Sequence, residues 1–124
     1  MYDSKLLEAN YLLGVSHLSL QDYEKAIKEL TYVIDKNPFF KKNIYILLAV
    51  GYKKLNFNVQ AIKILNQCII KFPKYYDAYI YRGKLFAKEK KHEKALCDYS
   101  HAITLNETVA LGFLGKADCL KMMG

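Results

Sequence analysis

Apolar residues recur along this chain with the spacing of amphipathic helices. In residues 22–38, DYEKAIKELTYVIDKNP, positions 26, 27, 30, 33 and 34 are apolar, which is the spacing of one helical face. The apolar run within residues 5–20 predicts a helix immediately before this stretch. Residues 5–38 are therefore predicted to form a helical hairpin.

The hairpin pattern returns twice in weaker form. Residues 57–73 read FNVQAIKILNQCIIKFP and residues 91–107 read KHEKALCDYSHAITLNE, so Ala26 aligns with Ala61 and Ala95 at spacings of 35 and 34 residues. A fixed period of this length is typical of stacked helical repeats. Small side chains are expected where two helices cross closely, because a larger side chain would push the axes apart. The same shift aligns four such small residues: Gly14, Ala49, Gly83 and Ala117.

These positions resemble the tetratricopeptide-repeat (TPR) family. The matching residues are Leu13, Gly14, Tyr23, Ala26, Leu30 and Pro38, then Leu48, Ala49, Tyr52, Ala61, Leu65 and Pro73, and finally Gly83, Phe86, Ala95, Tyr99 and Ala102. The resemblance implies an all-α, right-handed superhelical solenoid of three helical hairpins plus a C-terminal helix. Residues 1–124 would form one array, with units at about 7–41, 42–75 and 76–109 and a terminal helix at 110–123.

The third unit departs most from the family pattern. Arg82 and Lys116 stand where the family has leucine, and Glu107 replaces the closing proline. Residues 110–124 match only the first helix of a fourth unit, so we expect the chain to be a fragment of a longer array. Three apolar residues of that helix are expected to pack on the preceding hairpin: Phe113, Ala117 and Leu120. Its other apolar side chains predict homo-oligomer contacts through the C-terminal helix.

Composition limits the class of protein. An apolar content of 52% over 124 residues is enough for a folded core. The apolar runs are too short to cross a membrane, and the N-terminus lacks a secretory signal, so a cytoplasmic location is expected. Three cysteines with 29- and 22-residue spacings fit neither a disulfide framework nor a zinc site.

No motif for catalysis, a metal or a cofactor is present. The chain has no glycine-rich phosphate loop, activated-serine motif or helical zinc pair. Cys97 and His101 lie one helical turn apart, but two ligands do not make a metal site. We therefore expect a protein that is not an enzyme and that holds no metal or cofactor.

The positive charge of the chain is unevenly placed. The formal net charge is +7, and residues 42–75 contain six lysines without an acidic residue. Arg82 is the only arginine, whereas surfaces that grip phosphates or read bases favour the arginine fork. Basic and aromatic residues also do not alternate along one exposed face. Nucleic-acid binding is therefore a disfavoured alternative.

In the resembling family, the first helix of each unit lines a concave groove. The resemblance implies an apolar groove lined by Tyr11, Leu12, Val15, Ile46, Leu47, Val50, Ile80, Tyr81 and Lys84. The alternative for each of these residues is burial between hairpins. Lysines at the ends of two first helices predict a basic edge made of Lys53, Lys54, Lys88, Lys90 and Lys91. A protein or peptide ligand that is partly apolar and partly acidic would suit both features, and a solvated rim without a partner is the alternative.

The family also provides a carboxylate clamp for acidic chaperone tails. Its positions fall here on Tyr11, Val15, Leu47, Asp77 and Tyr81. None of these is basic or an asparagine, so the resemblance implies that the clamp is absent.

The predicted function is a non-catalytic protein-interaction module with a scaffold or adaptor role. The main alternative is a self-associating structural segment. Because many cytoskeletal and ciliary assemblies use such arrays, the cytoskeleton, a cilium or a basal body is an alternative location.

Overall fold

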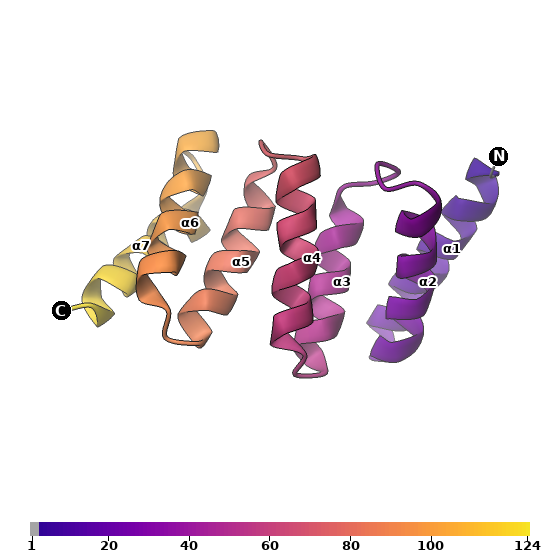
Figure 1. Cartoon of the computed structure of the whole chain (residues 1–124), viewed down its shortest axis with the longest axis horizontal. Coiled ribbons are helices and arrows are strands. Elements are labelled where there is room, and N and C mark those ends of the chain that lie inside the picture. Colours follow the sequence, from indigo (N-terminus) through magenta and orange to yellow (C-terminus); the bar gives the residue numbers. More distant parts are fainter. Residues whose placement is uncertain (1–2) are drawn as a thin grey trace. The chain divides into compact units, whose positions relative to one another are not determined.

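A computed structural model describes residues 3–124, which form seven α-helices and no strand (Figure 1). The helices are α1 (Ser4–Ser19), α2 (Tyr23–Lys36), α3 (Asn43–Lys54), α4 (Asn58–Lys71), α5 (Tyr76–Lys88), α6 (His92–Leu105) and α7 (Ala110–Met122). Helices α5 and α7 begin at the first residues of the predicted third unit and terminal helix. The predicted all-α helical repeat is confirmed.

The chain divides into two compact units within α4. The first unit ends at Ile64 and the second begins at Leu65. In the first unit, α2 packs against α1 and α3, and in the second, α6 packs against α5 and α7. Each unit therefore contains one helical hairpin, the helix that follows it and a part of α4.

The predicted apolar stripe of α2 forms its buried face. Ala26, Leu30 and Val33 are fully buried, and Ile34 is buried as well. At the start of α1, the Asp3 carboxylate accepts a hydrogen bond of 2.9 Å from the backbone N–H of Lys5. Such a cap satisfies a donor that has no partner within the helix. The buried face of α2 and the start of α1 are thus set by side chains that the sequence pattern already displays.

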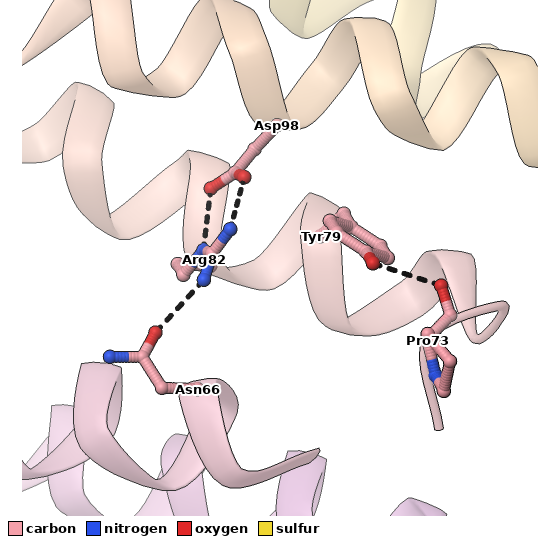
Figure 2. Close-up of polar contacts among 5 residues, drawn as sticks. All are labelled: Asn66, Pro73, Tyr79, Arg82 and Asp98. Carbon is pink, nitrogen blue, oxygen red and sulfur yellow. Dashed lines mark hydrogen bonds and ion pairs between the residues drawn. The ribbon is translucent and has the colours of Figure 1, made fainter. Parts of the chain in front are cut away.

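A tyrosine hydroxyl ties each proline turn to the helix that follows it. Tyr45 of α3 donates a hydrogen bond of 2.8 Å to the Pro38 carbonyl oxygen, and Tyr79 of α5 donates one of 2.9 Å to the Pro73 carbonyl oxygen (Figure 2). The two bonds repeat the same arrangement in the two units. Each one holds the start of the next first helix against the preceding turn.

The two helices of a hairpin approach each other at a glycine. A Cβ atom added to Gly14 of α1 would lie 2.7 Å from the Leu30 side chain of α2. A Cβ atom on Gly83 of α5 would lie 3.1 Å from the Tyr99 ring of α6. Both contacts are shorter than ordinary van der Waals separations between carbons, so both positions require a small residue.

Helix α7 packs on α6 through a different face from the predicted one. Phe113 and Leu120 are each 50% exposed, and Ala117 is exposed as well. Gly14 and Gly83 face the second helix of their own hairpins, whereas Ala117 at the corresponding position of α7 is exposed. The residues that α7 turns toward α6 are instead Gly112, Gly115 and Cys119. The prediction that Phe113, Ala117 and Leu120 pack on the preceding hairpin was wrong.

Each turn between the helices of a repeat contains a residue with positive φ. The values are 62° for Gln21, 64° for Asn56 and 62° for Lys90. This left-handed conformation costs an L-residue roughly 1–2 kcal/mol, while glycine adopts it readily. Asparagine tolerates it better than lysine or glutamine does. The turns therefore carry backbone strain that is greatest at Gln21 and Lys90.

Replacing Lys90 with glycine should relieve this strain. We expect Lys90→Gly to raise the free energy of unfolding by about 0.5–1 kcal/mol, after the larger entropy loss of glycine on folding is included. Asn56→Gly should have a smaller effect. Urea denaturation of both variants checks this expectation, and a larger gain from Asn56→Gly than from Lys90→Gly would contradict it.

Candidate functional site

In the first unit, five of the predicted groove residues lie on two helices that contact each other. Tyr11, Leu12 and Val15 belong to α1, and Leu47 and Val50 belong to α3. Leu12 is 54% exposed and the other four are half-buried. These five side chains, called below the apolar face of α1 and α3, all keep accessible surface.

Polar contacts fix one end of this face. Asn43 Nδ2 donates a hydrogen bond of 2.9 Å to the Tyr11 hydroxyl, which links α3 to α1. The Lys41 ammonium lies 5.2 Å from the centroid of the Tyr11 ring and 3.5 Å from Glu8 Oε2. The Lys41 ammonium therefore makes a cation–π contact with Tyr11 and an ion pair with Glu8, both within its own unit.

Two predicted groove residues are packing residues. Ile46 is 7% exposed and Ile80 is 2% exposed, so neither offers surface to a partner. For Ile46 and Ile80 the alternative of burial therefore applies, because both side chains lie in the protein core. On α5 the other predicted residues stay accessible: Tyr81 is half-buried and Lys84 is exposed, with its ammonium 5.3 Å from the centroid of the Tyr81 ring.

The predicted basic edge contains a cavity in the second unit. Lys54, Lys88, Lys90 and Lys91 are exposed, and Lys53 is half-buried. A cavity of about 490 Å³ is lined by Lys90, Lys91, His92, Glu93, Lys94 and Met123. It lies at the start of α6, which has no side-chain cap and where the helix dipole adds positive potential. The walls can therefore attract an acidic group, and the Met123 thioether adds an apolar surface.

Sequence reasoning missed part of this cavity. Lys94 follows Lys90 by four residues, and helical spacing could have added it to the basic edge. Met123 comes from the end of α7, and only the packing of α7 on α6 brings it to the cavity.

Arg82 and Asp98 form a buried ion pair inside the second unit. Arg82 Nε and Nη2 donate hydrogen bonds of 2.8 and 2.7 Å to the two oxygens of Asp98, as Figure 2 shows. Arg82 Nη1 donates a third bond, of 2.9 Å, to Asn66 Oδ1. Asp98 is only 4% exposed, and its hydrogen bond with Arg82 raises the pKa of the guanidinium. The pair explains the arginine at a position where leucine was expected, because Arg82 neutralises a buried carboxylate.

Removing one member of this pair should cost far more than removing both. We expect Arg82→Leu to lower the free energy of unfolding by about 3–5 kcal/mol, because Asp98 would stay buried without a counter-charge. The double variant Arg82→Leu/Asp98→Ile places there the residue types that Leu48 and Ile64 supply one period earlier. It should regain most of the loss, since well-packed apolar replacements of buried ion pairs are often neutral.

Thermal or urea unfolding of the single and double variants measures both effects. A double variant as unstable as Arg82→Leu alone would contradict this account of the pair.

The remaining titratable candidates do not converge on a reactive site. Cys119 is buried, and burial raises the pKa of its thiol, which disfavours the reactive thiolate. Burial likewise raises the pKa of Tyr99 to about 12. Cys97 and His101 are both exposed, and the His101 ring stacks on Tyr79 with 4.3 Å between ring centroids. Within residues 3–124, no three histidine, cysteine or acidic side chains are grouped closely enough to hold a metal ion.

No helix within the described residues 3–124 is both long enough and apolar enough to cross a bilayer.

Comparisons with known proteins agree with the repeat pattern. A family model described as tetratricopeptide repeat matches residues 8–39. No protein of curated function matches the sequence. Several solved TPR domains have the same fold, although their sequence identity to this chain is low.

One similar structure is the first TPR of Spaghetti (RPAP3) bound to the HSP90 peptide SRMEEVD, with 21% sequence identity and a TM-score of 0.88. The alignment covers 98% of this chain and 95% of the Spaghetti chain. The TPR2B domain of yeast Sti1 in its pHsp70 complex is 24% identical, with coverages of 94% and 97% and a TM-score of 0.82. The crystal structure of MamA is 20% identical, with coverages of 98% and 71% and a TM-score of 0.88. At these identities the likeness establishes the fold.

Proposed function

We propose that this chain, a tetratricopeptide-repeat protein by its residues 8–39 and by its fold, is a non-catalytic module that binds a peptide or helix of another protein. The accessible apolar face of α1 and α3 carries this proposal. Burying apolar surface lowers the free energy by about 25 cal/mol per Å², so an accessible apolar face of this kind favours binding of a partner. Two structural neighbours, the TPR domains of Spaghetti and Sti1, are solved in complex with the HSP90 peptide SRMEEVD and with pHsp70, respectively.

The ligand is proposed to differ from an acidic chaperone tail. The five positions of the family's carboxylate clamp hold Tyr11, Val15, Leu47, Asp77 and Tyr81. All five are half-buried, and none carries a cation. Asp77 places a negative charge where the clamp needs a positive one, which would repel a terminal carboxylate. These residues favour a ligand held mainly by apolar contacts.

The basic edge is proposed to add an acidic feature to the preferred ligand. Lys90, Lys91 and Lys94 surround a cavity whose wall also contains Met123. An acidic side chain in the cavity would meet lysines and the positive end of α6 together. Because these lysines are exposed, their contribution should act mainly on the association rate and weaken as salt rises.

A self-associating scaffold segment is the second candidate function. The exposed apolar side chains of α7, such as Leu111, Leu114 and Met122, are the observation that favours it. A cytoskeletal or ciliary location stays a prediction that follows from the family resemblance.

Groove variants test the proposed function directly. Peptides selected from a random 16-residue display library against the intact chain supply the probe. Tyr11→Ala, Val50→Lys and Tyr81→Ala should each weaken binding of the selected peptide by at least about tenfold, because each removes apolar contact or adds an unpaired charge. Circular dichroism and melting should change little, since the three side chains are only half-buried.

Lys63→Ala, an exposed change on α4, is the matched control and should leave binding unchanged. Binding that survives all three groove variants would place the site elsewhere. A parallel titration with the peptide SRMEEVD tests the clamp, and tight binding of this peptide would overturn the proposed ligand chemistry.

A further inference from the structure

Helix α1 carries an apolar seam that is exposed within the described residues 3–124. Leu6, Ala9, Leu13 and Ser16 follow one another at spacings of three, four and three residues, and Leu20 continues the series after another four. All five are exposed, with Leu6 at 53%, Leu13 at 46% and Leu20 at 77%. Alternating three- and four-residue steps are the spacing of a two-helix coiled-coil seam.

The same repeat positions form a helix–helix contact elsewhere in the first unit. A shift of 35 residues carries positions 9, 13 and 16 onto Ile44, Leu48 and Gly51 of α3. Ile44 and Leu48 are fully buried, and a Cβ atom on Gly51 would lie 3.1 Å from Ile27 of α2. This face of a first helix is therefore built to pack against another helix, and on α1 it is exposed.

We infer that the seam of α1 pairs with α1 of a second copy of this chain, in an antiparallel arrangement about a two-fold axis near Tyr11. This inference goes beyond the proposed groove function, which uses a neighbouring face of the helix and shares only Leu12 with the pairing surface. In antiparallel pairing, Leu6 of one copy faces Ser16 of the other, and Ala9 faces Leu13. Each of the four layers formed by Leu6, Ala9, Leu13 and Ser16 then joins one large and one small side chain, so the helices can approach closely and evenly.

Parallel pairing would fit less well. Leucine would face leucine in the layers of Leu6, Leu13 and Leu20, while alanine and serine would face themselves in the layers between. The wide leucine layers would hold the axes apart and leave gaps at the small layers.

The charges beside the seam agree with the antiparallel pair. On one side of the seam, Asp3 flanks the core layers beside His17 of the second copy, whose imidazole N–H can donate to the carboxylate. On the other side, Lys5 lies beside Ser19 of the second copy, so no like charges meet. Leu12, 54% exposed, lies beside the two-fold axis and would face its own symmetry mate. Stable interfaces bury about 1,200–2,000 Å². A seam on one short helix buries less area than this, so the dimer should be weak.

Sedimentation equilibrium of the intact chain tests the dimer. Between about 10 μM and 1 mM, the average mass should rise from 14.4 kDa toward twice that value. Leu13→Glu should weaken the dimer by at least about tenfold, because the charge enters the symmetric interface twice. Leu114→Glu on α7, where the native leucine is 62% exposed, is the matched control and should leave the dimer intact.

Circular dichroism should show both variants folded, since neither leucine is buried. A monomer at every concentration would overturn the inference. So would a dimer that survives Leu13→Glu, and dissociation by Leu114→Glu alone would assign the contact to α7.

Disulfide trapping tests the orientation. Lys5→Cys and Ser19→Cys variants, both with the exposed Cys97 changed to serine, are mixed and mildly oxidised. Antiparallel pairing should give mainly the mixed disulfide between positions 5 and 19. A predominance of disulfides between identical positions would overturn the antiparallel arrangement.

Discussion

The close crossing of paired helices at a small residue is the constraint on which the rest of this structure depends. Gly14 meets Leu30 in the first unit, and Gly83 meets Tyr99 in the second, at distances that leave no room for a Cβ atom without movement. The alanines that anchor the second helices, Ala26 and Ala95, are fully buried. Because small residues bring the axes together, the large side chains around them can form a packed core.

The accessible faces follow from this constraint. Once a hairpin is held by its crossing residues, the first helix presents one face to its own second helix and another to the neighbouring hairpin. The remaining face stays accessible, which exposes Tyr11, Leu12 and Val15 of α1. The core can also vary locally, and Arg82 with Asp98 stands where the preceding period has apolar residues, at the cost of burying one carboxylate and half-burying one guanidinium. The proposed binding and pairing surfaces both lie on faces that the crossing does not use.

The repeat period made the helices predictable, because each period carries its own apolar stripe and its own small residue. The faces of α7 were not predictable in the same way. Its sequence shows apolar residues on several sides, and the choice of Gly112, Gly115 and Cys119 depends on the shape of α6. The burial of Ile46 and Ile80 likewise depends on neighbouring helices. The pairing of Arg82 with Asp98 joins residues on different helices, although an arginine at a leucine position was a signal for a buried partner.

Thermal unfolding of one matched pair of variants tests the central role of the crossing residues. Gly83→Leu inserts a side chain where a Cβ atom alone would lie 3.1 Å from the Tyr99 ring. Ala117→Leu makes a similar change one period later, at an exposed position. The account predicts a loss of about 1–3 kcal/mol, and a melting temperature lower by about 4 °C or more, for Gly83→Leu. It predicts a change within about 0.5 kcal/mol for Ala117→Leu. Equal melting temperatures for the two variants would contradict the account.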